Sequence, residues 1–280
     1  MKNALTVDVE DYFHVTAFES VISPADWDRY PLRVSDNTRR ILDLFDRFAV
    51  KGTFFILGWV AERDPGLVRE IRQRGHEIAC HGYGHRLIYR IGAEAFRTDV
   101  RRAKTLLEGI TGEPVIGYRA PSYSITGASL WALDILIEEG FTYDSSIFPI
   151  MHDIYGMPDA PRFPHDISRP AGIIREFPIS TLQIGSVRVP VGGGGYLRLL
   201  PATLFRRVFN RINCRDRQPA VLYFHPWEID PRQPRVAGAS ARSRFRHYLN
   251  LDRMEQKLCI LLSSLRFAPM AEVLVRIPAA

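Results

Sequence analysis

The sequence of this 280-residue chain predicts an α/β fold, namely a distorted and incomplete (β/α) barrel with a C-terminal helical extension. Short apolar runs alternate with helix-like segments in the first half, which is typical of βαβ units and a parallel sheet. Eight complete units need more chain than lies before residue 230, so we expect the barrel to be incomplete. An amphipathic stretch over 243–265 predicts the helical extension.

The first half of the chain supplies the first strands and helices in turn. The expected strands are 4–9, the apolar β-rich run 52–58 and the short run 76–80. Helical periodicity and start signals predict helices over 35–48, 65–74, 93–109 and 127–140, the second of which begins at a proline and stops at a glycine.

The composition changes after Pro149, where residues 149–170 are rich in Pro, Asp and His and predict a long loop or insertion. Strands are expected over 173–179 and 187–191, and a buried strand over 219–226 ends in a histidine. We therefore expect a main domain over 1–230, with an insertion at about 149–200, and an extension over 231–280 that packs on it.

Composition restricts the class of protein. The chain is 46% hydrophobic and 24% charged, as in an ordinary globular protein, and has no run of 18 apolar residues that would predict a membrane span. Acidic residues follow the N-terminus almost at once, so no signal-peptide core is expected and the protein should be cytoplasmic. The three cysteines, Cys80, Cys214 and Cys259, fit free thiols in a reducing compartment.

Arginine gives the chain a net charge of +6 and an isoelectric point of about 9.4. No nucleic-acid-binding motif accompanies the basic runs, so we expect no nucleic-acid partner. A basic surface that favours an anionic glycan or a membrane face is the preferred interpretation, and it includes peripheral association with the inner face of the membrane.

Two groups of candidate functional residues follow predicted strands. Asp8, Glu10 and Asp11 crowd the end of the first strand, and alternation along a strand puts Asp8 and Glu10 on one face. His81 and His85 follow the third strand, and two imidazoles four residues apart can bind one metal when the intervening chain turns tightly. Two histidines and one carboxylate leave coordination positions open, as catalytic metal sites do.

Two further segments carry polar residues whose meaning is open when each is taken alone. Arg119 lies beside a proline turn in Tyr118-Arg-Ala-Pro-Ser-Tyr-Ser124, and His225 ends an apolar strand in 222–228. An arginine beside a turn is commonly structural, and a histidine at such a strand end is more often a satisfied core residue than a catalyst.

Together the four segments resemble the polysaccharide deacetylase family, carbohydrate esterase family 4, over roughly residues 4–228. The resemblance implies a deacetylase barrel in which Asp8 is the general base, His225 is the general acid and Arg119 orients the base. It implies a divalent metal, Zn²⁺ or alternatively Co²⁺, Ni²⁺ or Fe²⁺, held by the two histidines and by Glu10 or Asp11.

The chain departs from the usual family pattern in its first, third and fourth motifs, and the acid-bearing fourth motif is present only as Asp144-Ser-Ser-Ile147. The first motif reads Asp8-Val-Glu-Asp11 where the family has adjacent aspartates, and strand alternation favours Glu10 as the ligand. The third motif contains an inserted serine, Ser122. With its Gly192–Tyr196 run and its C-terminal extension, the chain resembles deacetylases of exopolysaccharide and exosortase-type systems, which implies a role in making or modifying an exported polysaccharide.

The expected function is therefore metal-dependent removal of acetyl groups, mainly N-acetyl, from an acetylated glycan or a lipid-linked saccharide, with a polysaccharide-synthesis complex as a further partner. Tyr123, Tyr196 and Trp227 are candidates for stacking against sugar rings, and packing in the core is an equally weighted alternative for each. Hydrolysis of a cyclic amide or another non-peptide C–N bond, and a catalytically inactive glycan-binding or assembly protein, are the alternative functions.

Overall fold

The computed structural model describes residues 1–152 and 155–276. The strands are β1 (Asn3–Val9), β2 (Thr53–Ile56), β3 (Glu77–Cys80), β4 (Gly117–Tyr118), β5 (Tyr143–Asp144), β6 (His165–Arg169), β7 (Gly172–Glu176), β8 (Thr181–Ile184), β9 (Val187–Pro190), β10 (Val221–Phe224) and β11 (Phe267–Ala268). The main sheet of the described residues has the order β10-β1-β2-β3-β4-β5-β7-β6, and β11 also pairs with β1. Its strands are parallel except for the antiparallel pair β6–β7, which confirms the predicted α/β class.

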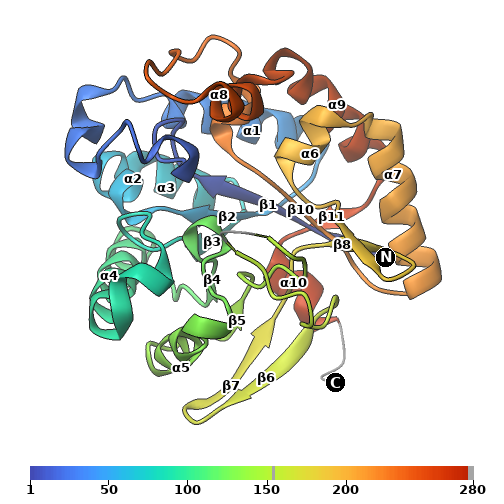
Figure 1. Cartoon of the computed structure of the whole chain (residues 1–280), viewed down its shortest axis with the longest axis horizontal. Helices are drawn as coiled ribbons and strands as arrows, with labels where there is room; N and C mark the ends of the chain where they lie inside the picture. Colours follow the sequence, from blue (N-terminus) through green and yellow to red (C-terminus); the bar gives the residue numbers. More distant parts are fainter. Residues whose placement is uncertain (153–154, 277–280) are drawn as a thin grey trace.

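Helices surround this sheet (Figure 1). The α-helices are α1 (Val34–Arg47), α2 (Gly58–Arg63), α3 (Pro65–Gln73), α4 (Ile88–Thr111), α5 (Trp131–Glu138), α6 (Gly194–Leu199), α7 (Ala202–Arg211), α8 (Ala241–Tyr248), α9 (Leu251–Ser264) and α10 (Met270–Val275). The shorter helical turns are η1 (Thr16–Phe18), η2 (Pro24–Arg29), η3 (Pro121–Tyr123), η4 (Gly127–Ser129), η5 (Ile212–Asp216) and η6 (Pro226–Ile229).

The first strand shows why the barrel has two separate hydrophobic regions. All seven residues of β1 are buried, and successive side chains of a strand point to opposite faces. Leu5 and Val7 pack into the larger core under the helices, whereas Ala4 joins an inner cluster with Phe55 and Tyr223. Asp8 belongs to the same alternating set as Ala4, so its carboxylate lies on the inner face of the barrel.

Irregular chain closes the barrel between β5 and β10. The backbone N–H of Tyr223 donates to the carbonyl of Gly192 at 2.8 Å, Val191 N–H donates to Ser180, and Ile179 N–H donates to Ile147, both at 3.0 Å. Apart from Tyr223 of β10, the residues that make these hydrogen bonds lie outside the named strands, so the ring is continuous but lacks regular strands on that side. This arrangement confirms the distorted, incomplete barrel that the sequence predicts.

Three strand and helix predictions need correction. The predicted loop over 149–170 contains β6, which pairs with β7 across an ion pair between Arg175 and Asp166 of 2.9 Å. The segment before the turn at Gly185 forms a further strand, β8, which makes a two-stranded hairpin with β9. Part of the predicted insertion, residues 153–154, lies outside the described residues.

The predicted helix over 243–265 is two helices, α8 and α9, because Asn250 between them has a left-handed backbone with φ of 50°. The guanidinium of Arg198 donates to the carbonyls of His247 and Leu249, and these two hydrogen bonds replace those of a continuing helix. Asn is among the residues that adopt this conformation at least cost. Helical periodicity in the sequence therefore continues through a position at which the helix itself is interrupted.

The C-terminal helices are part of the main fold. Met254 and Leu258 of α9 are completely buried in the same core as Leu5, and β11 pairs with the beginning of β1. The division of the chain at residue 230 stays a prediction. Among the described residues no helix is both long and apolar enough to span a bilayer.

Candidate metal centre and catalytic groups

The polar residues of the candidate site stand at the carboxyl ends of neighbouring parallel strands. Asp8 lies at the end of β1 and Glu10 just beyond it, His81 follows β3, Arg119 follows β4, and His225 follows β10. Because β10, β1, β2, β3 and β4 are adjacent in the sheet, these side chains meet at one end of the barrel. Functional groups of (β/α) barrels are positioned in this way.

Glu10, His81 and His85 form a compact group that could hold a metal ion. Each offers one ligand atom, and these atoms all lie within 4.8 Å of one another. Oε2 of Glu10 is 2.6 Å from Nε2 of His85 and 3.9 Å from Nε2 of His81. Two imidazoles with one carboxylate are a donor set that suits Zn²⁺ and other first-row divalent metals.

The tautomer of His81 fits a ligand role. Its Nδ1–H donates to the backbone carbonyl of Arg119 at 2.8 Å, which leaves the lone pair of Nε2 directed at the cluster. Burial lowers the pKa of His81 to about 4, so the imidazole is neutral near pH 7. The buried Glu10 carboxylate is ionised, because His85, His225 and His81 outweigh the effect of burial and lower its pKa below the usual range.

Asp11 lies outside this cluster. Its carboxylate accepts hydrogen bonds from the backbone N–H groups of Arg33 at 2.6 Å, of Val34 at 2.8 Å and of Tyr12 at 2.8 Å. The first two donors belong to the start of α1, so Asp11 ties the end of β1 to that helix. Of the two carboxylates that the sequence leaves open as ligands, the geometry brings only Glu10 to the histidines.

A residue that sequence reasoning missed, Asp99 of α4, holds the turn between the two histidines. Its carboxylate accepts hydrogen bonds from the N–H groups of Tyr83 at 2.7 Å and Gly84 at 3.1 Å. Gly82 has a φ of 71°, and a Cβ there would lie 2.9 Å from Asp99 Oδ2. An aspartate in the middle of an amphipathic helix gives no sequence signal of this role, because a solvated side chain is the ordinary expectation.

Arg119 is completely buried and fixes Asp8. Its Nη1 donates to Asp8 Oδ1 at 2.6 Å and to Thr6 Oγ1 at 2.8 Å. On the other side Nε donates to the carbonyl of Ser145 at 3.1 Å and Nη2 donates to the Ser145 hydroxyl at 3.0 Å. The guanidinium also lies over the Phe55 ring, 4.1 Å from its centroid. A buried ion pair with several further hydrogen bonds is held in one geometry.

His225 lies on the other side of Glu10. Its Nε2 is 3.6 Å from Glu10 Oε1 and 4.0 Å from Asp8 Oδ2, and its Nδ1–H faces Glu228 Oε1 at 2.8 Å. Burial lowers the pKa of His225, but the carboxylates of Glu10, Glu228 and Asp8 outweigh it and raise that pKa to about 9. The free chain therefore carries a protonated imidazole at this position near neutral pH.

Glu228 is a second residue that the sequence reasoning did not single out. Besides His225 Nδ1 it accepts a hydrogen bond from the His225 backbone N–H at 3.1 Å and one from Arg198 Nε at 2.7 Å. Both Glu228 and Arg198 are buried. The signal was its spacing, because a carboxylate three residues after the histidine, across the Pro226 turn, can reach back to the ring.

The glycine run before Tyr196 allows the start of α6 to lie very close to β10 and to Glu228. A Cβ on Gly192 would meet the backbone carbonyl of Val221 at 2.7 Å, and one on Gly193 would meet the Tyr223 hydroxyl at 2.6 Å. A Cβ on Gly194 would lie 2.6 Å from both Cδ and Oε2 of Glu228. The run therefore brings the start of α6 against β10 and against the carboxylate that holds His225.

The three candidate sugar-stacking residues differ in exposure. Trp227 is buried and its ring stacks on His225, with centroids 5.2 Å apart, and on His247, with centroids 4.2 Å apart. Tyr123 is also buried and makes edge contacts with Phe148 and Tyr223. For these two the geometry favours the packing alternative.

Tyr196 is half-buried and remains a candidate for contact with a ligand.

The serine that departs from the usual third motif produces a local strain next to Tyr123. Ser122 and Tyr123 have φ values of 50° and 54°, in the left-handed region that non-glycine residues rarely adopt.

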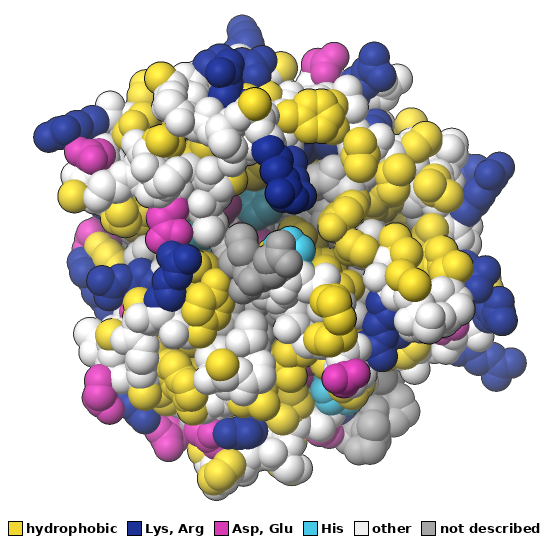
Figure 2. Space-filling view, viewed as in Figure 1, with side chains coloured by type: hydrophobic (Ala, Val, Ile, Leu, Met, Phe, Trp, Pro, Cys, Tyr) yellow, Lys and Arg dark blue, Asp and Glu magenta, His cyan; other side chains and the backbone are white. Residues whose placement is uncertain are grey.

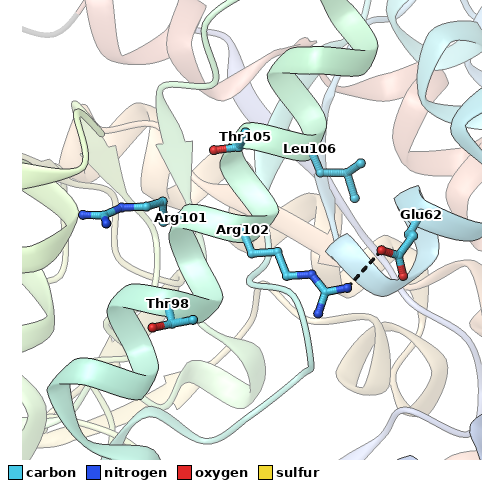
Figure 3. Close-up of a pocket in the computed structure, with 6 residues that line it drawn as sticks. All are labelled: Glu62, Thr98, Arg101, Arg102, Thr105 and Leu106. Carbon is cyan, nitrogen blue, oxygen red and sulfur yellow. Dashed lines mark hydrogen bonds and ion pairs between the residues drawn. The ribbon is translucent and has the colours of Figure 1, made fainter.

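A surface groove lies apart from this site, between α2 and α4. The residues that line it are Glu62, Thr98, Arg101, Arg102, Thr105 and Leu106. In Figure 3 Arg102 points across the groove to Glu62, with which it forms an ion pair of 2.9 Å, while Arg101 points away. The Arg102 guanidinium also stacks on Tyr83, 3.5 Å from the ring centroid, so one wall of the groove supports the histidine turn.

The fold and the site together place this protein in the class of α/β barrels that carry a candidate metal centre at the carboxyl ends of their strands. Residues 26–136 match the family model described as polysaccharide deacetylase, and residues 145–275 match one described as a domain of unknown function (DUF3473). The match to the polysaccharide deacetylase family therefore lies in the first of these two segments, which contains His81, His85 and Arg119.

Curated relatives match over part of their length. The chain is 34% identical over 110 residues to the peptidoglycan deacetylase-like protein FGM2 of Gibberella zeae, covering 39% of this chain and 32% of that protein. It is 32% identical over 98 residues to a peptidoglycan-N-acetylglucosamine deacetylase of Bacillus cereus, covering 35% of this chain and 36% of that protein. The chain thus spans about a third of the length of these relatives.

Solved structures show the same fold over nearly the whole chain. A Mycobacterium smegmatis protein described as a polysaccharide deacetylase superposes with a TM-score of 0.61 and 22% identity, covering 99% of this chain and 90% of that one. The PuuE allantoinase superposes with a TM-score of 0.58 and 16% identity, covering 98% of this chain and 88% of that one. At these identities the likeness shows the fold alone.

Proposed function

We propose that this chain is a metal-dependent deacetylase that removes acetyl groups, mainly N-acetyl, from a sugar unit of a glycan. The observation that carries the proposal is the arrangement of three groups in one buried site. The candidate metal ligands Glu10, His81 and His85 lie between a carboxylate fixed by a buried arginine and a protonated histidine fixed by a buried glutamate.

The Glu10, His81 and His85 cluster would hold the metal. A divalent metal bound there supplies a Lewis acid that polarises a carbonyl oxygen and makes water more acidic. The protein prepares this site in advance, because Arg119 O fixes the His81 ring and Asp99 fixes the turn that carries His85.

Asp8 is the proposed general base. Arg119 occupies its Oδ1 through the 2.6 Å hydrogen bond, and Oδ2 is the oxygen that faces His225. The free lone pairs of Oδ2 would take a proton from the attacking water. Because the guanidinium is held by Thr6 and Ser145 as well, the carboxylate does not need to reorganise during the reaction.

His225 is the proposed general acid. Its Nδ1–H is engaged by Glu228, so Nε2 carries the proton that can be given to the departing amine. Glu228 stays ionised, since Arg198 and His225 outweigh burial and lower its pKa. A positioned acid of this kind contributes about 10²–10⁴-fold to the rate. The products would be acetate and a free amino sugar.

The proposed biological context is the synthesis or modification of a bacterial exopolysaccharide, in which this chain acts on an acetylated or lipid-linked saccharide. The resemblance of its Gly192–Tyr196 run and its C-terminal extension to exopolysaccharide-associated deacetylases supports that context. A relative's name, peptidoglycan-N-acetylglucosamine deacetylase, supports an N-acetyl group as the target.

Product analysis with three substrate classes tests this function. Zinc-reconstituted protein is incubated with N-acetylated chito-oligosaccharides, with O-acetylated xylo-oligosaccharides and with allantoin, and acetate and primary amine are quantified. We expect equal amounts of acetate and amine from the first substrate. Ring opening of allantoin without acetate release from either glycan would instead support the cyclic-amide alternative, which the shared barrel fold permits.

A further inference from the structure

Charge is distributed very unevenly along this chain. Residues 177–249 contain twelve arginines, no lysine and three acidic residues, a formal charge of +9 in a chain whose total is +6. Two of those acidic residues, Glu228 and Asp230, are buried in ion pairs with Arg198 and Arg33. The surface of this segment is therefore almost purely cationic.

The arginines of α7 and α8 lack the carboxylate partners that arginines elsewhere have. In contrast, Arg63 of α2, Arg74 at the end of α3 and Arg97 of α4 each form ion pairs with Asp or Glu. Within the described residues, no ion pair involves a set of six exposed arginines on α7 and α8, namely Arg206, Arg207, Arg211, Arg242, Arg244 and Arg246. Such unpaired cations are available to an external anion.

Exposed aliphatic and aromatic side chains occur on the same two helices, on α6 and on the β8–β9 hairpin. Leu199 at the end of α6 is 56% exposed, Leu204 of α7 is 41% exposed and Phe245 of α8 is 64% exposed. Ile184 and Val187, at the tip of the β8–β9 hairpin, are 57% and 60% exposed. Figure 2 shows hydrophobic side chains gathered over α6, α7 and the hairpin, with Lys and Arg side chains around them.

The helices that carry this surface are joined to one another and to the candidate site. Arg198 of α6 donates to the carbonyls of His247 and Leu249 at the end of α8. Lys257 of α9 donates to two carbonyls of α6 and to the carbonyl of Leu200, which follows that helix. The same Arg198 donates to Glu228, the partner of His225. In Figure 2 histidine side chains are visible in a hollow on the same face of the molecule.

We propose that the surface formed by α6, α7, α8 and the β8–β9 hairpin docks on a bilayer that contains anionic phospholipids. A bilayer offers anionic headgroups to the arginines and an apolar boundary to Leu199, Leu204 and Phe245 at the same time. An anionic glycan or a nucleic acid would satisfy the arginines but would leave these apolar side chains in water. Docking by this face would hold the opening of the candidate site next to saccharides at the membrane surface.

Vesicle co-sedimentation of the full chain tests the proposal. The lipids are phosphatidylcholine alone and phosphatidylcholine mixed with phosphatidylglycerol. A charge variant combines Arg206→Gln, Arg207→Gln and Arg244→Gln, and an apolar variant combines Leu199→Ser with Leu204→Ser. Because all five side chains are exposed, both variants should fold, which thermal unfolding checks. The matched control, Arg69→Gln with Arg90→Gln and Arg101→Gln, likewise removes three exposed arginines, from α3 and α4.

We expect the chain to bind the mixed vesicles and to bind neutral vesicles at least tenfold more weakly. Each arginine near an anionic surface contributes about 1 kcal/mol, so the charge variant should bind about 100-fold more weakly. The apolar variant should also lose affinity, and the control should not. Failure to bind mixed vesicles, or equal binding by both variants and the control, would overturn the proposal. Two results together would overturn the bilayer as the occupant. They are vesicle binding by the apolar variant as tight as that of the native chain, and binding of the native chain to a soluble polyanion as tight as to the mixed vesicles.

Discussion

The glycine run in front of α6 allows a matched pair of substitutions to test the role of Glu228. Gly194→Ala would place a Cβ 2.6 Å from Cδ and Oε2 of Glu228, whereas ordinary contact begins near 3.4 Å. Gly195→Ala, one residue later in the same helix, would meet only the end of Arg198 at 3.9 Å. Neither glycine has a left-handed backbone, so each alanine fits the local conformation.

The size of the effect follows from these contacts. Glu228 would have to retreat by about 1 Å, and it holds His225 through hydrogen bonds of 2.8 and 3.1 Å. Misplacement of a catalytic group by about 1 Å can lower the rate about 100-fold. We therefore expect Gly194→Ala to lower kcat about 100-fold while metal binding is kept. Gly195→Ala should keep activity and raise the free energy of unfolding by about 0.4–1 kcal/mol.

Acetate release under saturating substrate, metal content and denaturant unfolding are measured for both variants. If Gly194→Ala retained the kcat of Gly195→Ala, the position of Glu228 would not matter and the proposed acid role of His225 would lose its support. A parallel loss of metal and activity would show that the substitution disrupts the site as a whole.

Three further outcomes are expected. Asp99→Ala should weaken metal binding by about 10–100-fold, and Asp99→Asn, which can still accept from one N–H, should lie between it and the native chain in equilibrium dialysis. Asp8→Asn should keep one equivalent of metal and lose about 10²–10⁴-fold in turnover; an active variant would remove Asp8 from the base role. Burial lowers the pKa of His76 to about 4 in the folded chain. As pH falls, His76 is protonated in the unfolded chain before it is protonated in the folded chain, so stability falls as pH decreases from about 6.5 toward 4. Between pH 7 and pH 5 this single group should lower the free energy of unfolding, measured with denaturant, by about 2 kcal/mol. His76→Asn should remove that loss, because its amide oxygen can still accept from Gly52 N–H. An unchanged pH dependence in this variant would contradict the assignment.

The positions of the first strands and of the two candidate metal-binding histidines could be predicted because their signals are local. Strand β1 is apolar and ends in acidic residues, and alternation alone selected Glu10 over Asp11 for the inner face. Motif order along the chain then indicated the family, which the match over residues 26–136 confirms.

The supporting residues could not be predicted because their partners are distant in sequence. The link from Arg119 to Asp8, more than a hundred positions earlier, is implied only by the family resemblance. Arg198 reaches Glu228 and the carbonyls that end α8, at least 30 positions later in the chain. The break at Asn250 depends on those same hydrogen bonds, so periodicity within 243–265 contains no sign of it. Likewise β6 is polar enough to read as a loop until its pairing with β7 is known.

Metal titration of the metal-free chain tests the central claim most directly. The chain is stripped with a chelator, Zn²⁺ is added in steps, and acetate release from an N-acetylated chito-oligosaccharide is recorded beside bound zinc. We expect no acetate release without metal and a rise that levels off at one equivalent, with neither zinc binding nor activity in His81→Ala. Undiminished acetate release by the stripped chain, or full zinc occupancy in His81→Ala, would contradict this expectation.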